Sequence, residues 1–240
     1  MLIECNALFS LKSLWSSKVA RSSEELDFSL YINLEHRTDR RRQIENQLML
    51  SQIHFSRVNA SGGSLEGRKC PYSTKKCLGI VGCQLSHVRA LELALAHDWP
   101  YVAIFEDDFR WSDNIDPKLI PGAIHSLMRS FQNWDVIALS LNILDKTELQ
   151  PHVEFDLGNF SVRVVNIHDA KATHAYVVNR RYLPTIRDVF LSCDTPNRSI
   201  DNCWRELQKK GLWLGFSPQL GSQRSGFSDI ENKQTSYNIP

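Results

Sequence analysis

The stretch Tyr101-Val-Ala-Ile-Phe-Glu-Asp-Asp108 decides the fold class of this 240-residue chain. Its first five residues form a continuous apolar run, which is typical of a strand buried on both faces of a sheet. Three carboxylates, Glu106, Asp107 and Asp108, follow the run directly. Open α/β sheets bind their ligands at the carboxyl ends of such strands. The stretch therefore predicts both a buried sheet and the place of its binding site.

The segments before this stretch alternate between helical and extended patterns. Residues 78–95 carry apolar side chains at steps of three and four, which predicts a helix that ends at Trp99-Pro100. Residues 28–34 alternate apolar with polar side chains and predict a strand, and residues 54–58 predict a second one. A helix with Ile44 and Leu48 at inward positions is predicted between them. Such alternation predicts an α/β fold with a mostly parallel central sheet and helices on both faces.

The second half of the chain is expected to extend the same sheet rather than to form a separate core. Strands are predicted at residues 136–141, 161–167, 173–178 and 212–216, and helices after Pro117, at 181–190 and at 199–210. Residues 61–76 are rich in Gly, Ser and Lys and predict a loop. At roughly 150 residues per domain, we expect one domain over residues 28–240.

Composition excludes several classes of protein. Lys plus Arg is 28 and Asp plus Glu is 27, so a net charge of +1 gives no attraction to nucleic acid. No continuous apolar run approaches the ~18 residues of a membrane span. The six cysteines include Cys70, Cys77 and Cys83, but no Cys-x-x-Cys pair. Free thiols in a reducing cytosol are therefore the expected state, and the expected location is cytoplasmic.

Residues 1–27 are predicted to be an N-terminal extension. Lys12, Lys18 and Arg21 interrupt the apolar residues there, so the segment lacks the continuous core of a secretory signal. The apolar residues fit one helix face with basic residues opposite. The segment is interpreted as a helix docked on the domain, and the alternative is a surface anchor on the inner face of an anionic membrane.

The three consecutive carboxylates after the buried strand predict a metal site. Adjacent like charges at a buried position repel each other unless a cation neutralises them. Mn²⁺ and Mg²⁺ prefer carboxylate and phosphate oxygens as ligands. The alternative is a solvated acidic turn. No Gly-x-Gly-x-x-Gly, P-loop, Gly-x-Ser-x-Gly or His-Glu-x-x-His motif occurs, which disfavours the commoner dinucleotide-binding and hydrolase classes.

Two further groups of residues are candidates for binding. Arg37 and Arg40 follow the first strand, and arginine recognises phosphate bidentately, so they can hold a nucleotide diphosphate. Arg41 and Arg42 are interpreted as a solvated helix face. Ser86-His87 lies beside the apolar face of the long helix, where a lone histidine is more often a buried structural residue than a catalyst.

Six short motifs occur in order along the chain. They are Tyr31-Ile-Asn-Leu-Glu-His-Arg-Thr-Asp-Arg40, Gly82-Cys-Gln-Leu-Ser-His87, Ile104-Phe-Glu-Asp-Asp108, Thr173-His-Ala-Tyr176, Ile200-Asp-Asn202, and Pro218-Gln-Leu with Gln223 and Ser228-Asp-Ile230. Together they resemble glycosyltransferase family 25, the lipopolysaccharide and procollagen galactosyltransferase family. The resemblance runs from about Ser29 to about Glu231.

The resemblance implies a GT-A-type fold and an inverting transfer of galactose or glucose from a UDP-sugar to a hydroxyl of a glycan or lipid-linked glycan. It implies that Mn²⁺ or Mg²⁺ is bound by Glu106 and Asp108. The residues implied to border the nucleotide are Asn33, Leu34, Arg37, Arg40, Ser86, His87 and Asp107. A role in lipopolysaccharide or surface-glycan synthesis is implied as well.

The acceptor hydroxyl needs a carboxylate as general base on the opposite side of the sugar. Asp201, which the resemblance places in the acceptor region, is the first candidate, and Asp194 is the second. The alternative for Asp201 is a helix-terminal residue that interacts with backbone N–H groups. Clustered carboxylates and arginine also fit a metal-dependent nucleotidyltransferase or phosphohydrolase, and a non-catalytic sugar-nucleotide binding module is the remaining alternative.

Overall fold

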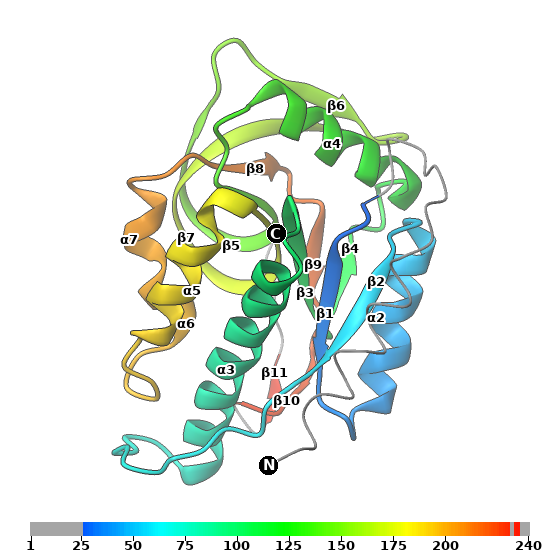
Figure 1. The fold of residues 1–240 in the computed structure, drawn as a ribbon. Coiled ribbons are helices and arrows are strands. Elements are labelled where there is room, and N and C mark those ends of the chain that lie inside the picture. Colours follow the sequence, from blue (N-terminus) through cyan, green and yellow to red (C-terminus); the bar gives the residue numbers. More distant parts are fainter. Residues whose placement is uncertain (1–25, 231–232, 236–240) are drawn as a thin grey trace.

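A computed structural model describes residues 26–230 and 233–235, in which helices cover both faces of a seven-stranded sheet (Figure 1). The strand order is β2-β1-β3-β7-β5-β8, and β6 pairs with β7. The strands are β1 (Ser29–Asn33), β2 (Phe55–Asn59), β3 (Tyr101–Glu106), β5 (Val136–Glu148), β6 (Glu154–Asp156), β7 (Ser161–Asn179) and β8 (Trp213–Ser217). β7 is antiparallel to β3, β5 and β8, whereas β1–β2, β1–β3 and β5–β8 are parallel pairs. β6 is also antiparallel to β7, so six of the seven strands run in one direction and only β7 runs against them. The expected mostly parallel sheet is therefore confirmed.

Alternating side chains of the central strands build two cores. In β1, Tyr31 points into the core on one face, and Leu30 and Ile32 point into the core on the other face. In β3, Phe105 and Ile104 divide in the same way. Because both faces are covered, every residue of β1 and residues 101–105 of β3 are buried, and in β3 this burial matches the continuous apolar run of its sequence.

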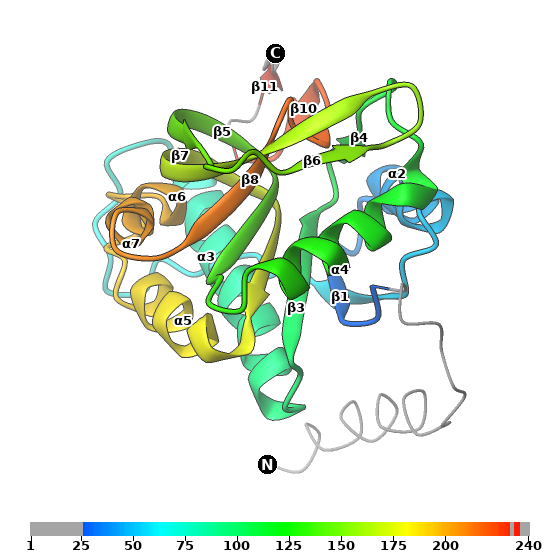
Figure 2. The ribbon, with the colours of Figure 1, turned by 90° about the horizontal axis from the view of Figure 1, so that it is seen from above.

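The helices pack on the two faces as separate groups (Figure 2). One face carries α2 (Thr38–Leu50) and α4 (Ile120–Ser130), and the other carries α3 (Thr74–Ala96), α5 (Leu183–Leu191), α6 (Ile200–Cys203) and α7 (Arg205–Gln208). Short 3₁₀ turns, Pro117–Leu119 and Arg180–Tyr182, precede α4 and α5. Two small sheets pair β4 (Phe109–Trp111) with β9 (Gly221–Gln223) and β10 (Gly226–Ser228) with β11 (Lys233–Thr235). The second half thus extends the sheet, as expected.

Helix α3 is long and apolar enough to cross a membrane by length and composition, and it is the one such helix among residues 26–230 and 233–235. Of its 18-residue apolar window, 56% is buried inside the protein. Val88, Leu91 and Ala94 belong to the core that also contains β1 and β3. Packing inside the protein therefore accounts for the apolar face of this helix.

Three predicted boundaries are wrong. The two strands predicted at 161–167 and 173–178 are one strand, β7, with register irregularities against β5. β5 extends to Glu148, well beyond the predicted end at Leu141, because its outer half is polar and exposed and carries no apolar pattern. The helix predicted at 199–210 is interrupted at Trp204, whose fully buried ring packs against Tyr176 and Trp213.

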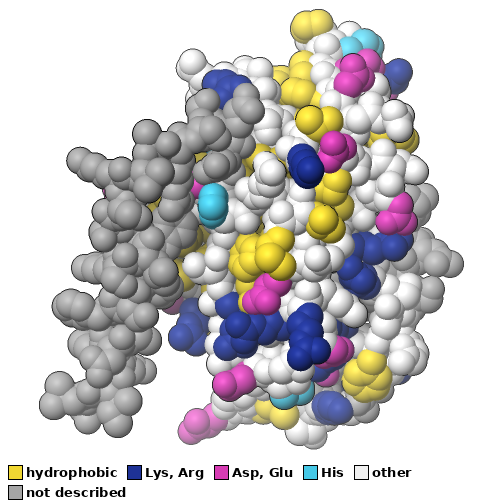
Figure 3. Space-filling view, turned by 90° about the vertical axis from the view of Figure 1, so that its right-hand side faces the viewer, with side chains coloured by type: hydrophobic (Ala, Val, Ile, Leu, Met, Phe, Trp, Pro, Cys, Tyr) yellow, Lys and Arg dark blue, Asp and Glu magenta, His cyan; other side chains and the backbone are white. Residues whose placement is uncertain are grey.

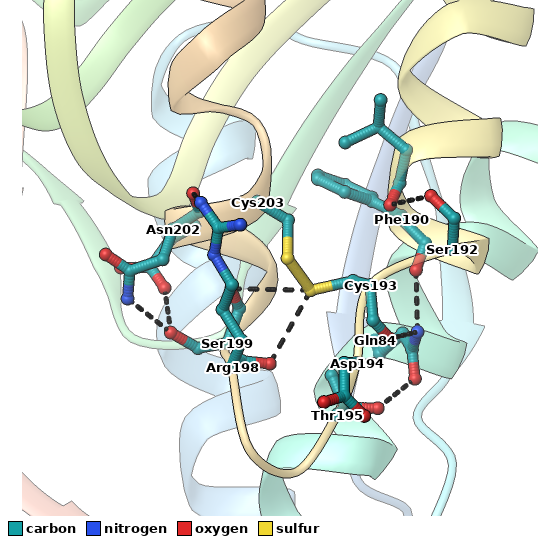
Figure 4. Close-up of a disulfide and its surroundings, with 12 residues drawn as sticks. Gln84, Phe190, Ser192, Cys193, Asp194, Thr195, Arg198, Ser199, Asn202 and Cys203 are labelled. Atoms are coloured by element: carbon teal, nitrogen blue, oxygen red, sulfur yellow. Dashed lines mark hydrogen bonds between the residues drawn. A yellow bond between two sulfur atoms is a disulfide. The ribbon is translucent and has the colours of Figure 1, made fainter.

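The expected free state of the cysteines is also wrong. Disulfides join Cys70 to Cys77 and Cys193 to Cys203, each with Cα atoms 5.9 Å apart. Figure 4 shows the Cys193–Cys203 bond. Neither the density of cysteines nor their spacing in the sequence indicated these bonds, because each one joins a cysteine outside the helices to a cysteine in a helix, Cys77 of α3 or Cys203 of α6. Cys83 is the free cysteine among the described residues. The helix predicted within residues 1–27 falls almost wholly outside the described part of the chain.

Candidate active site

Two cavities open at the carboxyl ends of β1 and β3. The larger, of about 530 Å³, lies between these strand ends, residues 60–62, the first half of α3 and residues 228–230. The smaller, of about 350 Å³, lies between α3, residues 172–174 of β7 and residues 196–202. The residues that line both cavities are Cys83, Glu106, Gln223 and Ile230. Since they share this wall, ligands in the two cavities would lie next to each other.

Asn33 and Arg40 hold the carboxylates that follow β3. The Asn33 amide nitrogen donates to Asp107 Oδ2 at 2.8 Å. One Arg40 nitrogen donates to Asp107 Oδ1 at 2.8 Å and to Asp108 Oδ2 at 3.3 Å. The structure therefore brings together four residues that the sequence predicted for one site. It also shows that Arg40 already neutralises part of the carboxylate charge.

Asp108 has one satisfied oxygen and one without a partner. Gln223 donates to Oδ2 at 2.9 Å, whereas Oδ1 is buried without a hydrogen-bond partner. Burial, with the nearby charge of Glu106, raises the pKa of Asp108 to about 7, although Arg40 opposes the shift. An oxygen in this position fits a cation ligand, since a divalent ion would satisfy it and lower the cost of burying the charge.

Glu106 has its side-chain partners on β7 and α3. Thr173 donates its hydroxyl to Glu106 Oε1 at 2.7 Å, and His87 Nε2 lies 3.4 Å from the same oxygen. Burial favours a higher pKa for Glu106, but the His87 and Thr173 side chains outweigh it and hold the pKa at about 2. Glu106 and Asp108 thus have different partners, and their shared metal site stays a prediction.

One cluster of three possible metal ligands converges among the described residues, and it differs from the predicted one. Ligand atoms of Cys83, His87 and Glu106 all lie within 4.8 Å of one another. Cys83 was missed as a candidate. The available signal was its position four residues before His87 on the predicted helix, which places both side chains on one helix face.

Three predicted nucleotide-binding residues occupy different surroundings. Leu34 lines the larger cavity directly. The Ser86 hydroxyl donates to the Gly82 carbonyl at 2.6 Å and accepts from the Ser61 amide at 2.9 Å, so it fastens the loop that lines the cavity. Arg37 is not among the lining residues and pairs instead with Asp39 and Asp229. It therefore holds a wall of the cavity rather than facing a ligand.

The outer arginines of α2 face solvent. Arg41 and Arg42 are exposed, and Arg41 pairs with Glu45 at 3.0 Å. Figure 3, which views the molecule from the side that carries α2, shows basic side chains gathered beside acidic ones over this face. The interpretation of these two arginines as a solvated face is confirmed. A basic residue that was missed is Lys75, which lines the larger cavity from the first turn of α3.

The two base candidates differ in position. Asp201 lines the smaller cavity, accepts from the Ala172 amide at 3.1 Å and accepts the Ser199 hydroxyl. Asp194 is exposed, lines neither cavity and accepts from Asn197 at 3.1 Å. The structure thus brings Asp201, and not Asp194, beside the other site residues.

The fold and the site together define a ligand-binding α/β protein. Its cavities lie at the carboxyl ends of parallel strands, and carboxylates and cationic side chains meet there. The chain belongs to glycosyltransferase family 25. The family's sequence profile, described as glycosyltransferase family 25 (LPS biosynthesis protein), matches residues 27–181. Asp194, Asp201 and Gln223 follow the matched region.

The named relatives match less than half of this chain, and the match covers only a small part of each relative. Procollagen galactosyltransferase 1-B of Xenopus laevis is 31% identical over 123 residues, which are 45% of this chain and 20% of that protein. "Probable inactive glycosyltransferase 25 family member 3" of Rattus norvegicus is 30% identical over 123 residues, which are 45% of this chain and 21% of that protein. The chain therefore spans about a fifth of the length of these curated relatives.

A solved glycosyltransferase involved in the glycosylation of the major capsid of PBCV-1 is similar over 85% of this chain and 96% of its own, at 12% identity and a TM-score of 0.49.

Proposed function

We propose that this protein is an inverting glycosyltransferase that moves a hexose, galactose or glucose, from a UDP-sugar to a hydroxyl of a glycan acceptor. One observation carries the proposal: a cavity that combines Asn33, Arg40 and three carboxylates adjoins a second cavity that contains Asp201. Membership of family 25 supports the class of reaction. Donor, acceptor and metal dependence are the parts that experiment must decide.

The larger cavity is the proposed donor site. Its volume of about 530 Å³ lies within the range of small-molecule sites, roughly 300–1,000 Å³. Arg40 and Lys75 line it and can face a diphosphate. Asp108, with its unpartnered oxygen, would hold Mn²⁺ or Mg²⁺, together with Glu106 as the resemblance implies. The bound cation supplies positive charge that favours departure of the nucleoside diphosphate.

The smaller cavity is the proposed acceptor site. An acceptor hydroxyl there would give its proton to the Asp201 carboxylate as its oxygen bonds to the anomeric carbon of the hexose. The bond between that carbon and the diphosphate oxygen breaks on the opposite side, and the configuration inverts. The Ala172 amide and the Ser199 hydroxyl fix the orientation of Asp201, which leaves its carboxylate positioned for this proton transfer.

Product analysis tests the proposal. The protein is incubated with UDP-galactose or UDP-glucose, Mn²⁺ and a panel of glycan acceptors, and the products are separated by mass. We expect a new glycoside that EDTA abolishes. Release of free sugar phosphate without a glycoside would indicate a phosphohydrolase, and a thermal shift with UDP-sugar but no turnover would indicate a binding module. Full transfer in excess EDTA would overturn the metal requirement.

The biological setting follows as a further part of the proposal. The family's description as an LPS biosynthesis protein supports a surface-glycan or lipid-linked acceptor, and a lipid-linked acceptor would bring the protein into peripheral contact with a membrane. The relative from Xenopus laevis carries the name of a collagen-modifying enzyme, so the acceptor panel includes a hydroxylated peptide as well as glycans.

A further inference from the structure

Three side chains of different chemistry meet at the wall between the two cavities. Cys83 and His87 lie four residues apart on α3, and Glu106 ends β3 opposite them. Their sulfur, nitrogen and oxygen ligand atoms all lie within 4.8 Å of one another. Cys83 and Glu106 line both cavities, so the cluster is open to ligands from either side.

The ring of His87 carries the observation that points to a ligand. Its side chain is 1% exposed, and its Nε2 atom is buried without a hydrogen-bond partner. The other ring nitrogen, Nδ1, lies 2.8 Å from the Tyr176 hydroxyl. When Nδ1–H donates to Tyr176, Nε2 has a free lone pair aimed at the cluster. A second hydrogen bond of this kind is the usual way in which proteins orient a metal-binding histidine.

The spacing fits a tetrahedral ion. Bonds of about 2.0–2.1 Å to nitrogen and oxygen at the tetrahedral angle place the two ligand atoms about 3.4 Å apart. The observed distance from His87 Nε2 to Glu106 Oε1 is 3.4 Å. A thiolate with an imidazole and a carboxylate is a borderline-soft set, which suits Zn²⁺ better than Mn²⁺ or Mg²⁺.

We propose that Cys83, His87 and Glu106 bind a divalent ion of the Zn²⁺ class. Glu106 then serves this site rather than the pair with Asp108 that the resemblance implies, and the donor-site cation is left to Asp108. Three protein ligands leave a fourth position open, as in zinc sites that bind water or substrate. Because Cys83 and Glu106 line both cavities, water or an oxygen of a bound substrate could reach an ion held there. The site exists whether or not the protein transfers a sugar.

Cobalt titration tests the ligand set directly. Co²⁺ replaces Zn²⁺ in such sites, and a cobalt–thiolate bond gives a charge-transfer absorption in the near ultraviolet. The full-length protein, stripped with EDTA and dialysed, is titrated with Co²⁺. We expect the thiolate band to saturate at one ion per chain, to disappear on addition of Zn²⁺ and to persist in excess Mg²⁺.

Variants assign the band to residues. Cys83→Ser removes the thiolate and is expected to abolish the band. Cys5→Ser changes the other cysteine outside the two disulfides, and Asp108→Asn changes the neighbouring carboxylate site; both are expected to keep the band. Tyr176→Phe leaves all three ligands in place and is expected to weaken cobalt binding about tenfold through the orientation of His87. A band that survives Cys83→Ser, or its absence from the unaltered protein, would overturn the proposal.

If the Cys83→Ser variant fails to fold, a measurement on the unaltered protein still tests the site. Cys83 is alkylated with iodoacetamide, and its modification is followed by peptide mass spectrometry with Zn²⁺, with Mn²⁺ and without metal. We expect Zn²⁺ to slow alkylation of Cys83 at least tenfold and Mn²⁺ to leave it unchanged. An alkylation rate that Zn²⁺ does not alter contradicts the site.

Discussion

Asp201 accepts one hydrogen bond at each carboxylate oxygen, from the Ala172 amide and from the Ser199 hydroxyl. An asparagine can keep the bond from Ala172 at its oxygen, and its NH₂ group can donate to the Ser199 hydroxyl instead of accepting from it. If Asp201 is the general base, Asp201→Asn lowers kcat by at least ~10²-fold. Affinity for UDP is expected to stay the same, and the stability cost to be about 1 kcal/mol or less.

The matched control for that variant is Asp194→Asn, which changes a nearby exposed carboxylate outside both cavities. We expect normal kcat in the control. Steady-state kinetics, calorimetry with UDP and thermal melting are measured on both variants. Normal turnover by Asp201→Asn with a lower melting temperature would assign Asp201 a structural role.

His174 makes stability depend on pH. Ser140 donates its hydroxyl to the Gly221 carbonyl, so it accepts from Nε2–H of His174 at 2.8 Å. Burial lowers the pKa of His174 to about 4, although the charge of Glu106 opposes the shift. The unfolded chain keeps a value near 6.5. Between about pH 6.5 and 4 the unfolded state binds the extra proton, so stability falls as pH falls through this window.

The expected loss from this one group is on the order of 3 kcal/mol across the whole window. Replacement of His174 by Gln keeps a donor for Ser140 and removes the titration. Urea unfolding at pH 6.5, 5.5 and 4.5 should therefore show a flatter decline for His174→Gln than for the unaltered protein. The exposed His36→Gln serves as control and should keep the original slope. Equal slopes for both variants would count against a neutral buried His174.

Helix α3 and the loop before it approach so closely that a glycine is required. A Cβ on Gly82 would lie 2.4 Å from the Ser61 carbonyl oxygen, whereas one on Gly122 of α4 would meet nothing within 4 Å. Gly82→Ala should displace the loop that lines the larger cavity, cost about 1–3 kcal/mol and weaken UDP binding. Gly122→Ala should instead stabilise the protein by about 0.5–1 kcal/mol. Urea unfolding of the two variants and calorimetry with UDP measure these effects, and equal stability changes would contradict the close packing.

The elements that could be predicted are those whose side chains are buried on a regular pattern. β3 is a continuous apolar run and α3 carries apolar side chains at steps of three and four, so residues 101–105 and 78–95 were predicted with the correct structure. The outer half of β5 pairs with β7 through backbone bonds while its side chains remain exposed. No side-chain pattern signals such a strand. The break at Trp204 likewise depends on tertiary burial.

At the scale of the whole molecule, the site was predictable where one segment contributes several of its residues. Glu106, Asp107 and Asp108 are adjacent in sequence, and their place after a buried strand predicted the cavity that the structure shows. Which side chain pairs with which carboxylate was not predictable. Arg40 pairs with Asp107 and Asp108, whereas His87 and Cys83 lie near Glu106 from α3. That division depends on how three separate elements pack.

The disulfides bear on the environment in which the whole molecule folds. Structural disulfides form in oxidising compartments, whereas the sequence led us to expect a cytoplasmic location. The Cys193–Cys203 bond closes a separation of 10 residues next to Asp201 and is expected to contribute about 2–3 kcal/mol. The double variant Cys193→Ser/Cys203→Ser should therefore lose this much stability and lower kcat, because residue 201 lies between the two cysteines.

Alkylation of whole cells before lysis decides between the two environments. We expect mass spectrometry to find Cys70, Cys77, Cys193 and Cys203 protected as two disulfides, and Cys83 as a thiol that is alkylated once metal is removed. Treatment with a reductant should then lower the melting temperature of the purified protein. The decrease should be smaller in the double variant, which lacks the Cys193–Cys203 bond. Full alkylation of all four cysteines in cells, with unchanged melting in reductant, would support a reducing cytosol, because bonds that never form there cannot contribute to the fold.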